Sequence, residues 1–350
     1  MNQYIQHSRV INETFCSQYI NLTGASSIKD ISRFKLNKIY RALAVYWKTF
    51  YLLMHQQIDL VYITPSTKGF SFYRDVCLIA LVKIFRKKVV LHLHSKGFRA
   101  FEHTWQSYLC ELIFNKSHVI ILSQKLLKDI QFIQGLYFPY IVANGVPVMP
   151  YSEKTTHTTF RILFLASLME SKGVFTLIKG VHLLIQDGHT NIELWIAGSI
   201  WKQSFQDTLL NYVKSHQLEK KILFLGPVYN EDKTNAFYNS DIYVLPTDYP
   251  QECFPLVILE AMQCGLPVIS TFEGAIPDII DDGKTGFLVP AKDPIVLAEK
   301  IKILLDKPEI TKSMGDEGQK KFIEYYTLEH FETSLVRVLS TILERSSAHS

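Results

Sequence analysis

Two glutamates, Glu252 and Glu260, are the residues of this 350-residue chain whose spacing most clearly predicts chemistry. Glu252 lies in a polar loop that contains proline, and Glu260 is the only charged residue in the apolar run 254–262. A carboxylate on so apolar a segment must face water, a cation or a polar ligand, because burying it unpaired costs too much free energy. Carboxylates accept hydrogen bonds well from neutral hydroxyls, so a sugar beside one and a ribose beside the other would fit.

The segments around these glutamates predict a strand, a loop, a helix and a second strand. Residues 242–245 are a short apolar run typical of a buried strand, and a polar loop follows them. The helix should cover residues 255–264, with Pro255 at its first position and Gly265 just past its end. Residues 267–270 read as the next strand. This order is the right-handed crossover of a parallel sheet, in which ligands bind beyond the carboxyl ends of the strands.

The start of the predicted helix, at Phe254, Pro255 and Leu256, is the expected phosphate site. The backbone N–H groups around Phe254 and Leu256 have no partner within the helix and lie at the positive end of its dipole. A phosphate group is the natural ligand there. The two carboxylates would then flank a phosphate, and they suit neutral hydroxyls better than an anion without a metal.

Glu252, seven residues and Glu260 together resemble the E-x7-E signature of retaining GT-B glycosyltransferases, in particular glycosyltransferase family 4 of the bacterial surface-polysaccharide type. The resemblance is close over residues 161–294 and includes the segments 274–280 and 286–290. It implies an α/β fold of two Rossmann-like domains whose parallel sheets face each other across a cleft. Proteins of this family open with a strand and a glycine-rich loop, and we expect the first strand of the N-terminal domain to be missing here.

The resemblance also implies the domain division. Residues 1–150 would form the basic, acceptor-binding domain, and residues 151–350 would form the domain that binds the nucleotide sugar. The turn at Asn144 and Gly145 resembles the family's crossover between domains. The last helix, at about 328–344, is expected to pack back on the N-terminal domain.

The family's donor-binding residues can be carried over to five positions. Glu252 would hold hydroxyls of the transferred sugar as a catalytic residue, and Glu260 would bind the ribose. Lys172 would bind the donor diphosphate. Ser167 stands where the family has an arginine, so Lys172 and the helix N-terminus would neutralise most of the phosphate charge. Val228 follows the predicted strand 221–225, in a segment whose backbone reads the nucleobase in similar enzymes.

Two further positions come from the first half of the chain. His94 ends the predicted strand 89–94, and in similar enzymes a histidine there approaches the transferred sugar. A histidine at a strand end is also a common structural residue that is simply hydrogen-bonded. Lys96 would meet an anionic acceptor or a phosphate.

The charge of the chain is unevenly placed. Residues 1–150 contain 18 Lys and Arg against 7 Asp and Glu, whereas the whole chain carries only +4. No zinc-finger or RNP-like motif supports nucleic acid as the partner of the basic half. An anionic membrane leaflet is the better candidate. The segment 28–54 is basic and rich in aromatic residues, which is typical of a helix at a membrane interface but also of a surface helix whose aromatic residues pack on a sheet.

The remaining composition limits the choice of compartment and cofactor. No apolar run approaches the length of a spanning helix, and the N-terminal residues lack the apolar core of a signal peptide. The five cysteines are scattered without metal-ligand spacing, which favours reduced thiols. We therefore expect a cytoplasmic protein, peripheral at the inner face of the cell membrane, with no metal and no cofactor other than its donor substrate.

The spacing of apolar residues predicts alternating strands and helices along the first half as well. Strands are expected at 16–22, 60–64, 89–94, 119–123 and 140–143, and helices at 1–15, 28–54, 72–85, 101–115 and 125–134.

The function predicted from these observations is transfer of a sugar from a nucleotide sugar to an acceptor hydroxyl, with retention of configuration at the anomeric carbon. The acceptor would be a lipid-linked saccharide in the synthesis of a surface polysaccharide or lipopolysaccharide. Three alternatives remain open. A sugar-nucleotide epimerase shares the fold, a glycosidase also uses paired carboxylates, and an inactive scaffold or membrane-binding protein would bind without turnover. The sequence does not identify the base, the sugar, the linkage or the oligomeric state.

Overall fold

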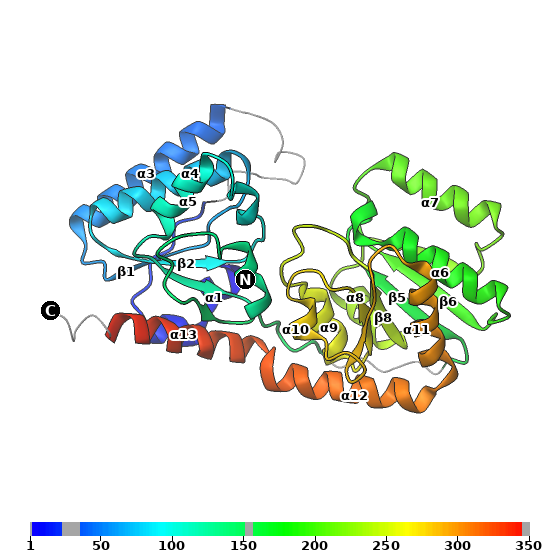
Figure 1. Cartoon of the computed structure of the whole chain (residues 1–350). Helices are drawn as coiled ribbons and strands as arrows, with labels where there is room; N and C mark the ends of the chain where they lie inside the picture. The colour runs from blue at the N-terminus through cyan, green and yellow to red at the C-terminus, as the bar shows by residue number, and fades with distance from the viewer. Residues whose placement is uncertain (1, 23–35, 151–156, 345–350) are drawn as a thin grey trace. The chain divides into compact units, whose positions relative to one another are not determined.

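The computed structural model of the chain describes residues 2–22, 36–150 and 157–344 (Figure 1). Contacts between Cα atoms divide the chain into two compact units. Unit 1 comprises Met1–Leu122, Leu127–Val142 and Glu332–Ser350, and unit 2 comprises Ser123–Leu126 and Ala143–Phe331. Each unit contains one parallel sheet, so the α/β fold with two parallel sheets that the sequence predicts is confirmed.

Unit 1 contains a four-stranded parallel sheet in the order β1-β2-β3-β4. The strands are β1 Leu60–Ile63, β2 Lys88–Leu93, β3 His118–Ile121 and β4 Tyr140–Ile141. The central strand β2 is buried over five of its six residues, because helices or loops cover both of its faces. Its carboxyl end delivers His94 and Lys96, which follow directly in the chain.

Three helices lie side by side on one face of this sheet, as Figure 1 shows: α3 Leu36–His55, α4 Gly69–Ile84 and α5 Gln106–Phe114. α4 joins β1 to β2 and α5 joins β2 to β3, so both are the crossover helices that parallel strands require. Their inner faces supply Phe72 and Phe114 to a core shared with Leu91 of β2.

Part of the predicted structure of unit 1 is wrong. The strand expected at 16–22 is not present, because most of those side chains are exposed and the segment adds to no sheet edge. The helix expected at 1–15 is two short helices, α1 Asn2–His7 and α2 Arg9–Thr14, because the Ser8 hydroxyl accepts a hydrogen bond from Ile11 N and so starts a new helix.

Two more predicted helices of unit 1 are shorter than expected. Within the segment 101–115, only α5 Gln106–Phe114 is α-helical, and the short 3₁₀ helix η2 Phe98–Phe101 precedes it. Within the segment 125–134, the helix ends at Asp129 and is the 3₁₀ helix η3 Gln124–Asp129. The part of the predicted helix 28–54 before Leu36 lies outside the described residues.

Unit 2 contains a six-stranded parallel sheet in the order β10-β9-β8-β5-β6-β7. Its strands are β5 Phe160–Leu165, β6 Ile192–Ala197, β7 Ile222–Gly226, β8 Ile242–Leu245, β9 Val268–Ser270 and β10 Gly286–Leu288. The order changes direction at β5, which pairs with both β6 and β8. In doubly wound sheets this switch point is where ligands bind.

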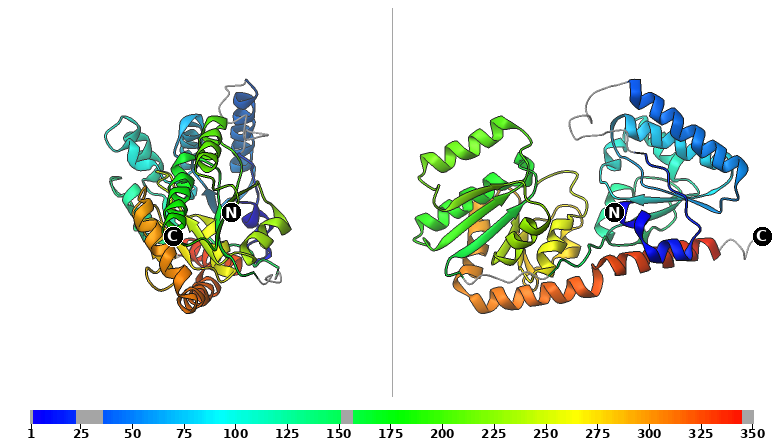
Figure 2. Two further views of the ribbon diagram at one scale, coloured as in Figure 1. Left: turned by 90° about the vertical axis from the view of Figure 1, so that its right-hand side faces the viewer. Right: turned by 180° about the vertical axis from the view of Figure 1, so that it is seen from behind.

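The helices of unit 2 cover both faces of its sheet, as the reverse view in Figure 2 shows. They are η4 Glu170–Lys172, α6 Val174–Gln186, α7 Gln203–Ser215, α8 Asn230–Tyr238, α9 Leu256–Gln263, α10 Ile276–Ile279, α11 Pro294–Asp306 and α12 Pro308–Tyr325. α6 packs on α11, and α9 packs on α12.

The last helix, α13 Leu328–Glu344, begins in unit 2 and continues into unit 1. Within unit 1, the Lys88 Nζ atom at the start of β2 donates hydrogen bonds to the carbonyl oxygens of Ile342 and Leu343, at 3.4 and 3.2 Å. A lysine at the last carbonyl groups of a helix also interacts favourably with the helix dipole.

Candidate active site

The crossover from β8 through α9 to β9 is the part of unit 2 that positions both glutamates. β8 is buried along its whole length, and the chain leaves its carboxyl end in the loop 246–255. Glu252 lies in this loop and Glu260 lies in α9. The predicted strand, helix and strand are thus confirmed, with boundaries that differ by one residue at most.

The helix α9 begins one residue later than the sequence predicts. Pro255 is the residue before the helix, with ψ of 108°, and not its first residue as expected, because Leu256 is the first to take helical geometry. No side chain caps the helix at Pro255. Phe254 is buried, its ring 6.0 Å from that of Tyr326, and holds the loop down at this point.

Glu252 and Lys172 form a buried ion pair. The Lys172 Nζ atom lies 2.6 Å from Glu252 Oε2, and the two side chains are only 16% and 9% exposed. The same carboxylate oxygen accepts a hydrogen bond from Thr247 Oγ1 at 3.1 Å. Lys172 Nζ also lies 4.7 Å from the centre of the Tyr249 ring, which is a cation–π distance. The sequence assigns Lys172 and Glu252 separate roles, and the structure joins them.

Backbone contacts explain how Lys172 reaches Glu252. Asp248 N donates to Ser171 O at 2.9 Å. Gly173 follows with φ of +78°, and a Cβ atom there would lie 2.0 Å from Pro246 O. Only glycine permits this approach, so the short turn after β5 is held against the loop after β8.

A second ion pair joins Glu260 to Lys233 of α8, with Lys233 Nζ 2.6 Å from Glu260 Oε1. Burial raises the pKa of Glu260, and the Lys233 ammonium acts in the opposite direction. One carboxylate oxygen is held by the lysine, so Oε2 is the atom available for a ligand hydroxyl. The Tyr243 hydroxyl donates a hydrogen bond to Leu165 O at 3.1 Å. Burial raises the pKa of this hydroxyl most, and the charges of Glu252 and Glu260 raise it further.

The loop after β9 also contacts the backbone of Glu252. Ala275 N donates to Cys253 O at 2.8 Å. Gly274 has φ of +56°, and a Cβ atom there would lie 2.3 Å from Glu252 O. The glycine of the 274–280 segment is therefore required by close packing against the glutamate loop.

Ser167 and Val228 lie at the same edge of the sheet as Glu252. Ser167 is exposed two residues after β5, and Val228 is half-buried two residues after β7. Because all strands of this sheet are parallel, the segments after their carboxyl ends share one edge. Ser167, Val228 and the loop that contains Glu252 thus lie at one edge of the sheet.

His94 and Lys96 belong to unit 1, beyond the carboxyl end of β2. The His94 ring lies 4.1 Å from that of His92, whose Nδ1 is 2.5 Å from the Tyr62 hydroxyl. Burial lowers the pKa of His94 to about 4, so its imidazole is neutral near neutral pH. Lys96 is half-buried, and its carbonyl oxygen accepts from Thr67 Oγ1 at 3.4 Å.

Sequence reasoning missed Lys233, Thr247 and Tyr249. Thr247 and Tyr249 stand in the loop already assigned to the site, so their position was an available signal. No signal pointed to Lys233, because nothing in the sequence shows that this residue of α8 reaches Glu260 of α9. Among the described residues, no group of three or more His, Cys, Asp or Glu is placed to hold a metal ion.

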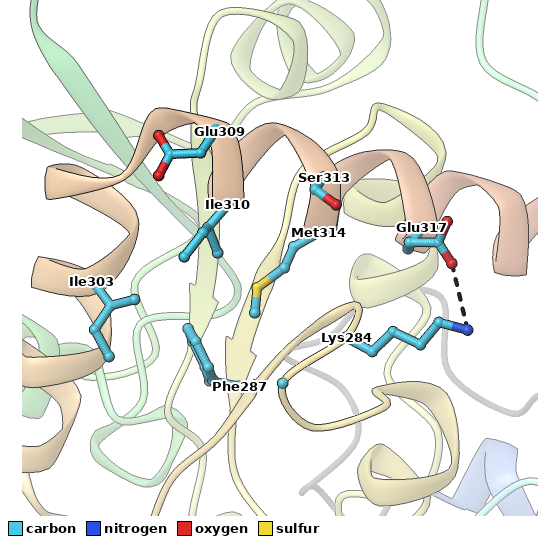
Figure 3. A pocket seen from close by; sticks show the side chains of 9 residues that line it. Lys284, Phe287, Ile303, Glu309, Ile310, Ser313, Met314 and Glu317 are labelled. Atoms are coloured by element: carbon cyan, nitrogen blue, oxygen red, sulfur yellow. Dashed lines mark ion pairs between the residues drawn. The ribbon is translucent and has the colours of Figure 1, made fainter.

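Unit 2 also has an open pocket of about 580 Å³ away from these residues (Figure 3). It lies between α11, α12 and the loop before β10, and Lys284 and Glu317 form an ion pair of 3.4 Å at its edge. None of the predicted site residues lines it.

The chain resembles known proteins in both fold and sequence. Its fold is that of GT-B glycosyltransferases: a structure of Anabaena Alr3699/HepE in complex with UDP-glucose covers 86% of this chain and 82% of its own, with a TM-score of 0.69 at 20% identity. Residues 150–321 match the family described as glycosyl transferases group 1. This match covers the β8–α9 crossover with both glutamates and both of their lysines.

Two curated relatives match parts of the chain. N-acetyl-alpha-D-glucosaminyl L-malate synthase of Bacillus anthracis is 36% identical over 122 residues, which are 35% of this chain and 31% of that protein. The capsular polysaccharide biosynthesis glycosyltransferase CapM of Staphylococcus aureus is 25% identical over 61% of this chain and 54% of its own length. The matched region thus spans about a third to a half of these relatives.

Proposed function

We propose that the protein is a glycosyltransferase that moves a sugar from a nucleotide sugar to an acceptor hydroxyl. The observation that carries the proposal is the group of two Lys–Glu pairs beside the uncapped N-terminus of α9, at the carboxyl edge of a parallel sheet. The group 1 match over the same residues and the named glycosyltransferase relatives support it.

In the proposed mechanism, the donor diphosphate binds Lys172 and the N–H groups at the start of α9, around Phe254 and Leu256. As the bond from the anomeric carbon to the diphosphate lengthens, negative charge grows on the leaving phosphate, and these donors stabilise it. When it binds, the diphosphate would replace Glu252 as the ion-pair partner of Lys172. Glu252 is then available to accept hydrogen bonds from hydroxyls of the transferred sugar and so to orient its anomeric carbon.

The Lys233–Glu260 pair would bind the ribose. Lys233 holds one oxygen of Glu260, and the other would accept from a ribose hydroxyl. We expect Glu260→Ala to weaken nucleotide binding more for a ribonucleotide than for its 2′-deoxy analogue, because the deoxy ligand has one fewer hydroxyl for the carboxylate. Equal losses for both ligands would contradict this role of Glu260.

We infer a retaining mechanism of the family 4 type, with His94 and Lys96 of unit 1 on the acceptor side. The acceptor would be a lipid-linked saccharide used for a surface polysaccharide, at the inner face of the cell membrane. The excess of basic residues in the first 150 positions and the capsular polysaccharide relative support this choice.

Calorimetric titration of the purified chain tests the donor class. UDP, GDP, ADP and their sugar conjugates are titrated without added metal and again with Mg²⁺. The proposal expects micromolar binding of one base in both conditions. Binding that requires Mg²⁺ would refute the metal-independent phosphate site, and no binding of any nucleotide would refute the transferase assignment.

A further inference from the structure

Helix α3 of unit 1 exposes an apolar stripe to solvent. Tyr40, Leu43, Trp47, Tyr51 and Met54 are 75%, 59%, 70%, 51% and 56% exposed among the described residues. Their spacing of three or four residues puts them on one side of the helix. The opposite side packs inward through Ala42, Thr49 and Leu53. Tyr40, Trp47 and Tyr51 therefore do not pack on the sheet, whereas Tyr46 packs inward and its hydroxyl donates to Arg74 O of α4 at 3.0 Å.

The two neighbouring helices extend this stripe. α4 exposes Phe70, Tyr73 and Ile84, and the segment from Trp105 through α5 exposes Trp105, Tyr108 and Leu112. The Tyr73 and Trp105 rings are stacked, with centroids 6.0 Å apart, so α4 and α5 form a continuous surface. The three helices lie side by side in both views (Figure 1, Figure 2). We call the exposed residues named here the aromatic face.

The exposed charges on α3 and at the ends of α4 are cationic. α3 contains no acidic residue, and Asp75 of α4 is buried against Arg74 at 2.7 Å. Exposed Lys48, Lys68 and Arg86 belong to α3 or to the ends of α4. Glu111 is the only acidic residue within α5.

This combination fits one kind of partner. Tryptophan and tyrosine have an apolar ring and a polar atom, and they are favoured where hydrocarbon meets lipid headgroups. Lysine and arginine beside them attract anionic headgroups. No described helix is long and apolar enough to span a membrane, so binding would occur in the plane of the interface.

We propose that the aromatic face of α3, α4 and α5 docks on an anionic lipid bilayer, with Trp47 and Trp105 inserted among the acyl chains. This inference rests on residues of unit 1 and needs no nucleotide. Its test can therefore fail while nucleotide binding succeeds, or the reverse.

The first experiment measures flotation of the whole chain with vesicles. Vesicles of phosphatidylcholine alone are compared with vesicles that also contain phosphatidylglycerol, at low and at high salt. We expect binding to the anionic vesicles and its loss at high salt. Lys48→Gln should weaken binding about 5-fold, as for loss of one basic residue near an anionic surface. No binding to anionic vesicles at low salt would overturn the proposal.

The second experiment separates insertion from simple charge attraction. Trp47→Ser should weaken vesicle binding roughly 10-fold, because one inserted aromatic ring is lost. Trp201→Ser is the matched control: Trp201 is 57% exposed but belongs to unit 2, so its loss should leave binding unchanged. Both side chains are exposed, so neither change should impair folding, which thermal unfolding checks.

Brominated acyl chains provide a direct measure of insertion, because they quench nearby tryptophan fluorescence. The quenched fraction of the fluorescence should fall in Trp47→Ser and should not fall in Trp201→Ser. Equal quenching in both variants would refute insertion by the aromatic face. A concentration-dependent dimer that is seen by light scattering and abolished by Trp47→Ser would also refute insertion. The aromatic face would then be an interface between two copies of the chain.

Discussion

Replacing Lys172 by methionine should cost both stability and nucleotide affinity, for two different reasons. The lysine is paired with Glu252 at 2.6 Å, and the side chains are 16% and 9% exposed. Removing one partner of a fully buried pair costs about 3–5 kcal/mol, because the other charge stays buried and unpaired. Here Thr247 Oγ1 still donates to the carboxylate at 3.1 Å. We therefore expect a loss of about 2 kcal/mol.

That loss corresponds to a decrease of about 4–8 °C in the melting temperature of a domain of this size. Differential scanning calorimetry measures it. The matched variant Lys172→Met/Glu252→Gln removes both charges, so it should regain most of the stability. If the double variant melts as low as the single one, the unpaired carboxylate is not the cause and the energetic reasoning is wrong.

Lys172→Met should also weaken nucleotide binding, and this loss should not be regained in the double variant. A charge-assisted hydrogen bond contributes about 1.5–3 kcal/mol, so losing the ammonium should weaken binding of the nucleoside diphosphate roughly 10- to 150-fold. The double variant should stay as weak as the single one, because neither has the ammonium. Recovery of affinity in the double variant would show that the loss came from distortion of the loop and not from contact between Lys172 and phosphate.

Substitutions at Glu252, His94 and Gly173 test three other features of the structure. Glu252→Gln leaves Lys172 available to phosphate, so nucleotide affinity should be unchanged or higher while transfer slows by about 100-fold or more; affinity lost together with transfer would contradict the separation of roles. The pKa of His94 is lowered by burial to about 4 from 6.5, so the unfolded chain binds more protons between these values. The free energy of unfolding should therefore fall as the pH falls through that window, and His94→Gln should lessen the fall in denaturant titrations. Gly173→Ala should destabilise by about 3 kcal/mol or more, because its Cβ atom would lie 2.0 Å from Pro246 O. Gly188→Ala, with φ of +95° but open space, should cost only about 1 kcal/mol, and equal losses would show that the contact is unimportant.

The segment around β8 and α9 shows how much local sequence determines. The apolar run 242–245, Pro255 and Gly265 bound the strand and the helix through backbone geometry alone, and the structure has both within one residue. The same holds for α13, whose predicted bounds of 328 and 344 are those observed. The residues that begin and end these elements lie within a few positions of the boundary, so the local sequence is enough to predict where each element begins and ends.

The segment 16–22 shows where local signals fail. Tyr19 and Ile20 favour a strand, but a strand needs a partner edge, and none of the described strands pairs with this segment. The Tyr19 hydroxyl instead donates to Ile5 O at 3.2 Å. Whether an apolar run becomes a strand depends on distant residues, which periodicity alone does not reveal.

The sequence by itself determined the alternation of strands and helices, the two glutamates and their loop and helix, and the lysine that follows the turn after β5. The tertiary structure decided which charges neutralise each other. Lys172 and Glu252 are 80 positions apart, and Lys233 and Glu260 are 27 apart, yet each pair meets at 2.6 Å. Side-chain pairing across elements follows from the sheet order and helix packing, and the energy of a charge depends on burial, which only the folded chain sets.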